Sequence, residues 1–294
     1  MFSSRTLVKA PGRNFATLQQ IQERIRAVTN IEKITKAMKM VSASKMKGDM
    51  NRLENGKDFA HQSVDMIFKC DTYMQRKSAP ETTEPKELLV PISSDRGLCG
   101  AINSGVIREI KNYLEGKDES NAELFCIGDK GTSAAIRPFS SILVENVQNL
   151  NYPLNFAMSL AIGSRIIALS QDKDKVVIFY NEFISAIAFE IRRIELMSKK
   201  NFLESMKFQR LYEQKRPDAS TANPALYELY IGSNLYHAQL QNAASEQSAR
   251  MNAMENASSN AAELIEALQL EFNKARQAMI TAELVEIISG ASAV

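Results

Sequence analysis

The sequence predicts two long terminal helices that pair antiparallel as a coiled coil, with a Rossmann-like α/β domain from the middle of the chain at one end. Neither glycine nor proline occurs from Ser233 to Ser289, and no proline occurs between Pro11 and Pro80. Between these stretches, short apolar runs alternate with helical patterns. The predicted segments are an N-terminal stalk helix over 16–80, a head over 87–200, a connector over 201–224 and a C-terminal stalk helix over 225–290.

The C-terminal stretch is too long for an ordinary globular helix. From Ser233 to Ser289 it would extend roughly 85 Å at ~1.5 Å per residue. Its apolar positions alternate steps of three and four, broken only at Ser258, which is a coiled-coil pattern with many small or flexible side chains. These positions are Met251, Met254, Ala261, Ile265, Leu268, Phe272, Ala275, Met279 and Ala282.

The N-terminal stretch has a matching apolar stripe and the opposite charge. Residues 16–60 contain nine basic and five acidic side chains, whereas residues from Ser233 onward contain three basic and seven acidic ones. Opposite charge and similar length favour pairing of the two helices. The stripe consists of Leu18, Ile21, Ile25, Val28, Ile31, Ile34, Met38 and Val41.

The middle of the chain predicts a small, mainly parallel sheet. Its expected strands and helices follow one another in alternation, and Phe183 to Met197 is a candidate for a further edge strand. The expected strands lie over 87–93, 123–127, 142–147 and 175–180, and the clearest helices over 101–114 and 155–170.

Composition excludes several classes of function. Of 294 residues, 36 are Lys or Arg and 34 are Asp or Glu, so the net charge of +2 gives no general affinity for nucleic acid. No apolar run approaches the ~20 residues of a membrane span. Three cysteines without CxxC spacing, and His61 and His237 without neighbouring ligands, predict no metal site and no disulfide framework. We find no catalytic constellation and expect no cofactor.

One glycine-rich turn leaves an enzyme open as an alternative. Ser93 to Gly100 lies between a predicted strand and helix, where main-chain amides can bind a phosphate. Its glycines fit neither GxGxxG nor GxxxxGK[ST], so nucleotide binding is weakly indicated. The simpler interpretation is a tight turn with glycine where a Cβ would clash, and the same holds for Gly128 to Gly131.

The first fifteen residues have the composition of an organellar presequence. Residues 1–15 contain Arg5, Lys9 and Arg13 with several hydroxyl side chains and no acid; the first carboxylate is Glu23. Arg13 to Ala16 resembles a mitochondrial processing site that would leave Ala16 as the first residue. A basic N-terminal tail is the other interpretation.

Three motifs resemble one family. The stretch from Arg26 to Lys45 (RAVTNIEKITKAMKMVSASK) is similar to the N-terminal signature of γ subunits of F-type ATP synthase. Ser94 to Ile102 (SDRGLCGAI) resembles a motif of the family's head. The closing motifs SEQSARM, from Ser245, and NKARQAMITAELVEIISGA, ending at Ala291, are the most specific. The family's extra cysteine-bearing segment of chloroplast members is missing here, which favours mitochondria.

The resemblance implies a non-catalytic rotor. A proton-driven membrane c-ring turns the central stalk of the F1 part inside a hexamer of α and β subunits, at the matrix side of the mitochondrial inner membrane. Because the stalk lacks threefold symmetry, it biases each catalytic β subunit towards a different conformation. Small central-stalk subunits of the δ/ε type and the c-ring would meet the head, near Asp95 to Gly100 and the Leu211–Glu213 connector. The implied partners include no nucleic acid.

The resemblance also implies partner contacts for individual residues. Lys36, Met38 and Lys39 match a region that faces an acidic loop of β. Arg276, Gln277 and Thr281 match positions that hydrogen-bond to β. Leu284, Ile287 and Ile288 belong to the apolar tip, which would turn in a hydrophobic bearing. The alternatives are a nucleotide- or phosphate-binding α/β enzyme with helical oligomerisation arms, and a coiled-coil scaffold.

Overall fold

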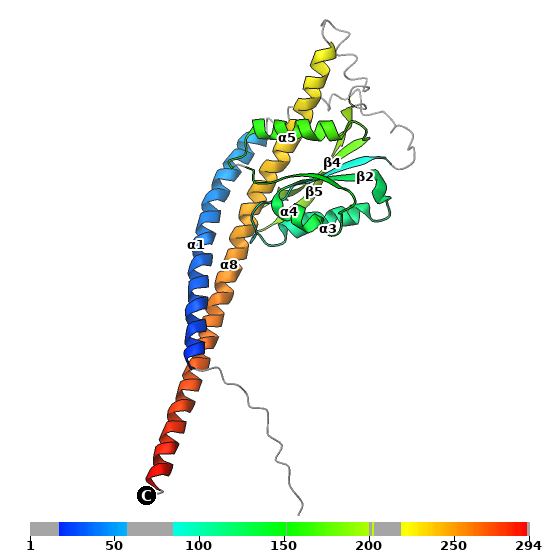
Figure 1. Ribbon diagram of the computed structural model, residues 1–294. Coiled ribbons are helices and arrows are strands. Elements are labelled where there is room, and N and C mark those ends of the chain that lie inside the picture. The colour runs from blue at the N-terminus through cyan, green and yellow to red at the C-terminus, as the bar shows by residue number, and fades with distance from the viewer. Residues whose placement is uncertain (1–17, 58–84, 151, 200–201, 203–218, 293–294) are drawn as a thin grey trace, which may run out of the picture. The chain divides into compact units, whose positions relative to one another are not determined.

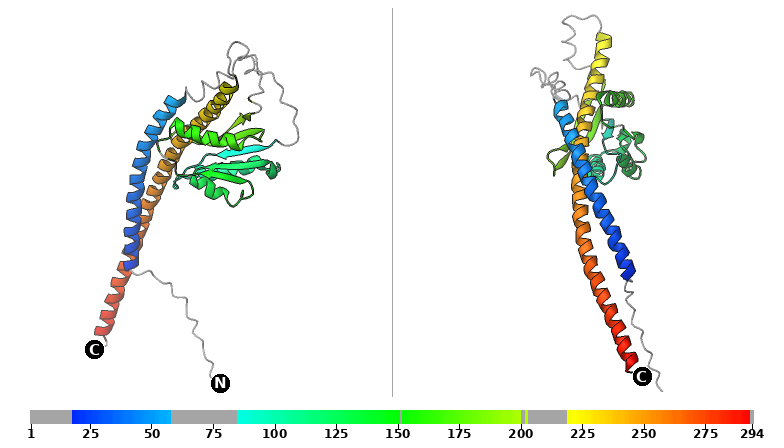
Figure 2. Two further views of the ribbon diagram at one scale, coloured as in Figure 1. Left: turned by 45° about the horizontal axis from the view of Figure 1, so that its top comes forward. Right: turned by 90° about the vertical axis from the view of Figure 1, so that its left-hand side faces the viewer.

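The computed structural model (Figures 1 and 2) describes residues 18–57, 85–150, 152–199, 202 and 219–292. The chain divides into two compact units, one of residues 1–37 with 255–294 and the other of residues 38–254. Helices α1 (Leu18–Lys57) and α8 (Ala219–Ala291) contribute to both units. Within the described ranges, no helix combines the length and apolar character needed to cross a membrane.

The second unit contains a five-stranded sheet in the order β3-β2-β1-β4-β5. Four strands are parallel, and β5 pairs antiparallel with β4, from Lys175 opposite Met197 to Phe183 opposite Phe189. All the predicted strands are present, including the edge strand. Their bounds are β1 Glu87–Pro91, β2 Ala122–Ile127, β3 Leu143–Val147, β4 Lys175–Phe183 and β5 Phe189–Met197.

Helices cover both faces of this sheet (Figure 1). Helices α3 (Ile102–Leu114) and α4 (Asp129–Ala135) pack on one face, and α5 (Phe156–Leu169) packs on the other beside the first part of α8. A short 3₁₀ helix, η3 (Glu119–Asn121), precedes β2. Asn155 caps α5, because its side-chain oxygen accepts a hydrogen bond from the Met158 amide at 2.8 Å.

Period-two alternation in the strands builds two cores. Leu88 and Val90 face α5 and α8, whereas Leu89 faces α3 and α4. Because both faces are covered, β1 and most of β4 are buried throughout. The core beneath α8 includes Tyr227, Ile231 and Leu235, all fully buried.

The predicted coiled-coil seam of α8 is confirmed from Met251 to Ala275 and is wrong at Met279 and Ala282, which are exposed. In the first unit, the second half of α8 runs antiparallel to the first half of α1 (Figures 1 and 2). Ala261 and Leu268 are buried at 6% and 8% exposure. Ser258, which the sequence marks as a break, is itself buried at 7% exposure. A small hydroxyl side chain therefore continues the seam, since it lets the helices approach closely.

The predicted stripe of α1 is wrong after Val28. Ile31, Ile34 and Val41 are 52%, 58% and 55% exposed, while Thr35 and Ser42 are buried at 8% and 2%. A 3.5-residue period returns to the same side of the helix every seven residues. Counted from Ile21, it reaches Val28 and then Thr35, Ser42, Asp49 and Gly56. Small side chains at these positions let the two helices approach closely. Ile31 and Ile34, although more hydrophobic, lie on an adjoining exposed face of α1.

Helix α8 begins earlier than the sequence predicts. It starts at Ala219 and includes Pro224 and Gly232, so the last six residues of the predicted connector are helical. The buried side chains that follow Pro224, such as Tyr227 and Ile231, hold the start of α8 on the sheet. Their packing outweighs the one helical hydrogen bond that Pro224 cannot donate. A Cβ at Gly232 would lie 2.5 Å from Leu160 Cδ2, so glycine there permits close packing of α5 on α8.

Several other predictions lie outside the described residues. These are the presequence, the part of the N-terminal helix from 58 to 80, His61 and the Leu211–Glu213 part of the connector.

Candidate functional site: the exposed end of α8 and the junction of α8 with the head

The last four turns of α8 are exposed all round. Phe272 and Ala275 are the last half-buried residues of the helix, and every described residue from Arg276 onward is exposed. Figures 1 and 2 show α8 continuing past the first turn of α1. Within the described part of this unit, no helix packs beside this end.

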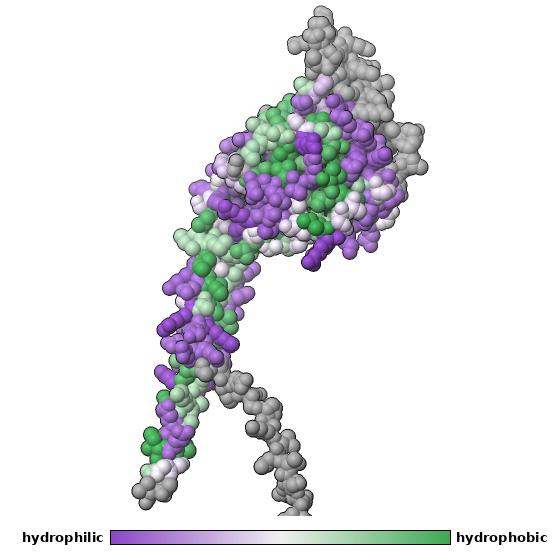
Figure 3. Space-filling model, viewed as in Figure 1, coloured by the Kyte–Doolittle hydropathy of each residue, from purple (hydrophilic) through white to green (hydrophobic). Residues whose placement is uncertain are grey.

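The exposed end of α8 carries a concentration of large apolar side chains. Figure 3 shows hydrophobic residues gathered over the end of the helix. A helix end with this much uncovered apolar surface indicates a binding surface for another protein. The residues are Met279 (53% exposed), Ile280 (57%), Leu284 (55%), Val285 (54%), Ile287 (70%) and Ile288 (58%).

The predicted polar contacts of α8 lie at the start of this exposed end, two before its apolar residues and one among them. Arg276, Gln277 and Thr281 are all exposed. The Thr281 hydroxyl donates a hydrogen bond to the Gln277 carbonyl at 2.9 Å, one turn back in the helix. The hydroxyl therefore still has acceptor capacity for a partner.

The predicted contacts on α1 form a separate surface. Lys36 is well exposed and pairs with Glu32 of the same helix at 2.5 Å, whereas Met38 and Lys39 are half-buried. A single exposed ion pair of this kind contributes little to stability. The Lys36 ammonium therefore remains accessible to an acidic partner.

Sequence reasoning missed how α8 joins the head. Residues 237–250 of α8 are all buried, yet most of them are polar. The segment crosses the carboxyl ends of β1 and β4. Asn181 of β4 donates to Asn242 (2.8 Å) and its carbonyl accepts from Ser245 (3.1 Å), while Gln241 accepts from the Phe183 amide (3.0 Å). A polar run in the middle of a long helix, with no charged side chain from His237 to Ser245 if the histidine is neutral, was the available signal.

This position is where an α/β sheet of this topology would hold a ligand. The strand order reverses between β1 and β4, and ligands bind in the crevice beyond the carboxyl ends of the strands at such a point. Here the crevice is filled by the chain's own helix. The fold therefore argues against the nucleotide-binding alternative.

The glycine-rich turn after β1 is likewise used internally. The Ser93 hydroxyl donates to the Ile127 carbonyl (2.8 Å) and accepts from the Gly131 amide (2.9 Å). The Asp95 carboxylate accepts from the amides of Asp129 and Leu150, both at 3.0 Å. Each of these groups is satisfied within the head rather than turned towards a phosphate.

The glycines of this region act for two different reasons. The predicted clash is confirmed at Gly128 and Gly131, where a Cβ would lie 2.4 and 2.3 Å from atoms of Ser93. It is wrong at Gly97 and Gly100, which have room for a Cβ. Gly100 is needed instead for its positive φ of 64°.

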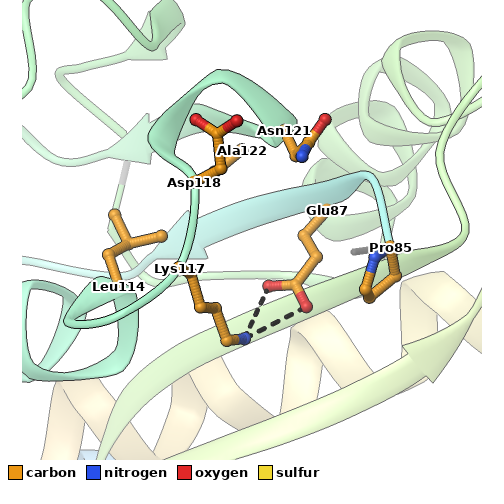
Figure 4. Close-up of a pocket in the computed structure, with 7 residues that line it drawn as sticks. All are labelled: Pro85, Glu87, Leu114, Lys117, Asp118, Asn121 and Ala122. Atoms are coloured by element: carbon orange, nitrogen blue, oxygen red, sulfur yellow. Dashed lines mark hydrogen bonds and ion pairs between the residues drawn. The ribbon is translucent and has the colours of Figure 1, made fainter. Parts of the chain in front are cut away.

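A small cavity at one edge of the head has no catalytic character (Figure 4). It measures about 110 Å³, below the size of usual ligand pockets, and opens at the amino ends of β1 and β2. Its charged groups are paired, with Lys117 Nζ 3.2 Å from Glu87 Oε1. The lining residues are Pro85, Glu87, Leu114, Lys117, Asp118, Asn121 and Ala122.

The titratable groups of the head are structural. Burial raises the pKa of the Cys126 thiol to about 12, which leaves it unreactive at neutral pH. Cys99 is buried beside Ser94 and Asn103. His237 is buried against the Tyr180 ring. Among the described residues, no group of three His, Cys, Asp or Glu side chains could hold a metal ion.

The fold and the exposed helix end define a protein of two long helices and an α/β head that carries a surface for binding another protein. The family described as ATP synthase matches residues 17–294. The chain belongs to the ATP synthase γ subunit family, whose members are non-catalytic central-stalk subunits of the rotary complex.

Individual relatives span nearly the whole chain. It is 35% identical to the mitochondrial ATP synthase subunit γ of Drosophila melanogaster, over 98% of this chain and 94% of that protein. It is 37% identical to the ATP synthase γ chain of Halothermothrix orenii, over 94% of this chain and 99% of that one.

Solved structures agree. A central-stalk chain of the Tetrahymena thermophila mitochondrial ATP synthase is 40% identical with a TM-score of 0.68, covering 76% of this chain and 99% of that chain. A chain of the Euglena gracilis mitochondrial ATP synthase has the same fold, with a TM-score of 0.80 at 22% identity, over 94% of each.

Proposed function

We propose that this chain turns as the central rotor of a mitochondrial ATP synthase, on the matrix side of the inner membrane. Its partners are the α and β subunits of the F1 hexamer, small central-stalk subunits of the δ/ε type, and the membrane c-ring. The names of its relatives support this proposal: those from Drosophila melanogaster and Saccharomyces cerevisiae are mitochondrial γ subunits, and the Tetrahymena structure is described as a central stalk with a c-ring.

The exposed end of α8 is the observation that carries this proposal. We expect the apolar residues Leu284, Ile287 and Ile288 to turn inside a hydrophobic bearing formed by α and β. Apolar contacts are not directional, so they hold an axle on its axis without fixing one angle. This explains why none of the described residues of its unit packs against the helix end.

Directional contacts are expected just before this end. Arg276, Gln277 and Thr281 carry donors and acceptors on an exposed stretch of helix. Hydrogen bonds from these groups to one β subunit at a time would distinguish three otherwise equivalent partners. Lys36, Met38 and Lys39 of α1 supply a second contact, in which the basic side chains follow an acidic loop of β.

Differential contact is what converts rotation into chemistry. A surface without threefold symmetry binds the three β subunits differently, and only such a difference can shift their conformational equilibria. Each proton supplies ~2.3 kcal/mol per 100 mV, so the work of several protons must be collected by the rotor for one ATP.

Two further assignments complete the proposal. Residues 1–15 act as a mitochondrial presequence, and their basic, hydroxyl-rich and acid-free composition supports this. The head meets the small stalk subunits and the c-ring near Asp95 to Gly100 and the Leu211–Glu213 connector.

Purification of the native protein with its partners tests the proposal. We expect one copy of this chain for three α and three β subunits, and no nucleotide binding by the isolated full chain in equilibrium dialysis with ATP. Recovery as a self-contained monomer, or stoichiometric ATP binding by the chain alone, would contradict it.

A further inference from the structure

Two loops of the head hold α8 at the same level. The first is the β4–β5 hairpin, residues 184–188. Its Ala186 carbonyl accepts hydrogen bonds from Ser248 Oγ at 2.7 Å and from Asn252 Nδ2 at 2.8 Å. Ser248 and Asn252 are four residues apart and lie on one face of the helix.

The second loop, residues 95–97, meets the other side of the helix. Arg250 donates from Nη2 to the Arg96 and Gly97 carbonyls, both at 3.3 Å, and from Nε to the Gly97 carbonyl at 3.4 Å. At 3.6 residues per turn, position 250 lies about 200° round the helix from position 248. The two loops therefore grip α8 from opposite sides.

Both partners of the Arg250 contact, the side chain and the loop, are themselves held in place. Arg250 is only 7% exposed and is fixed by Glu246 Oε1 at 2.7 Å and Gln247 Oε1 at 3.3 Å. On the loop side, Ser94 Oγ donates to the Arg96 carbonyl at 2.7 Å. The amide contacts of Asp95 described above tie the same loop to the segments after β2 and β3.

We infer that the two loops form a collar that fixes the rotational position of α8 in the head, with Arg250 as its positioning residue. The inference rests on the proposed rotor function. Torque about a helix axis is resisted most effectively by contacts on opposite sides, which act as a couple. The collar lies at Ser248–Asn252, just before the compact unit of the head ends at Met254, and is therefore the last set of contacts between α8 and the loops of the head.

Arginine suits this position better than lysine. Its planar guanidinium presents several donors in a fixed geometry and so reaches two adjacent carbonyls at once, whereas a lysine ammonium acts as a single point charge. The acceptors are main-chain carbonyls, so the grip depends on the loop's path rather than on the side chains of Arg96 or Gly97.

The test must avoid leaving a buried charge unpaired. Arg250→Ala alone would strand the Glu246 carboxylate in the interior and threaten folding. The double variant Glu246→Gln/Arg250→Met keeps the side-chain volume and removes both charges. The pair Ser248→Ala/Asn252→Ala removes the opposite side of the grip, and Arg108→Met on the exposed face of α3 is the matched control.

The variants are introduced into the whole ATP synthase complex, with three measurements. We expect each double variant to assemble and hydrolyse ATP as the unchanged complex does, because the exposed end of α8 is untouched. ATP-driven proton pumping per ATP hydrolysed should fall by about half. Thermal angular fluctuation of a bead on the head, with the α/β hexamer immobilised, should widen in variance about twofold. Arg250→Lys should give intermediate values, and the Arg108 variant should change neither.

The outcomes separate the collar from the rotor proposal. Unchanged pumping and unchanged fluctuation in both assembled double variants would overturn the collar and leave the rotor function standing. A variant complex that fails to assemble, when Arg250→Lys also fails, would overturn it as well, since Arg250 would then serve folding. Absence of any rotation of the unchanged head would refute the rotor function itself.

Discussion

The apolar end of α8 makes a quantitative prediction for the double variant Ile287→Ser/Ile288→Ser. These side chains are 70% and 58% exposed. Fully burying an isoleucine is worth roughly 1.5–3 kcal/mol, so covering their exposed portions contributes roughly 1–2 kcal/mol each. Losing both should weaken binding to the α/β hexamer by about 3 kcal/mol, or about 100-fold. The stability of the chain itself should not change, because neither side chain is in a core.

Competition during assembly measures this difference. Tagged variant and untagged unchanged chains are produced together with α and β, and the variant's share of the isolated complexes is compared with its share of the total. The double variant Ile136→Ser/Val144→Ser is the matched control, because these residues are 52% and 46% exposed on the head. Equal incorporation of the Ile287/Ile288 variant, or an equal loss in the control, would refute the bearing.

Three further predictions concern other parts of the chain. Arg276→Ala together with Gln277→Leu should lower coupled ATP synthesis or the amount of assembled complex while the thermal unfolding of the head stays the same; normal synthesis would show that these residues make no required contact. Gly48→Ala should raise the free energy of unfolding in denaturant by about 1 kcal/mol, because a Cβ there meets no atom within 4 Å. Gly232→Val should lower the free energy of unfolding by about 1–3 kcal/mol, because its side chain clashes with α5. Burial raises the pKa of the Cys126 thiol to about 12, so only about one thiol in ten thousand is ionised at pH 8. The thiol should therefore resist alkylation until the chain is unfolded. Mass spectrometry after a short iodoacetamide pulse would detect modification of the folded chain if this is wrong.

The sequence predicted the elements well because their patterns are strong. The strands are short apolar runs bounded by turn residues, and α8 is long and free of helix breakers except near its ends. Its seam through Ala261 and Leu268 was readable because those positions are both apolar and correctly spaced. The same pattern continues through Met279 and Ala282, which are exposed, so the spacing alone did not show where the pairing of α8 with α1 ends.

The seam of α1 could not be predicted because hydrophobicity and burial disagree there. Ile31 and Ile34 are more hydrophobic than Thr35, yet Thr35 is buried. Close approach of two helices selects small side chains, and an apolar stripe offered to other subunits looks in the sequence like a core stripe. The pattern alone cannot tell which of two adjoining faces meets the chain's own partner helix.

The junction of α8 with the head was hidden for a related reason. Asn242, Ser245 and Arg250 are polar, and a polar stretch of helix predicts a solvent-exposed face. They are buried because each finds a partner on a segment far away in the sequence, such as Asn181 or the Gly97 carbonyl. Only the tertiary fold brings these partners together.

Rotation of the head tests the central claim most directly. The α/β hexamer is fixed to a surface, a bead is attached to α3 through an exposed Arg108→Cys, and saturating ATP is added. The account predicts continuous rotation of the bead in one direction, at a rate that follows ATP hydrolysis. A bead that keeps one orientation while the complex hydrolyses ATP would contradict it.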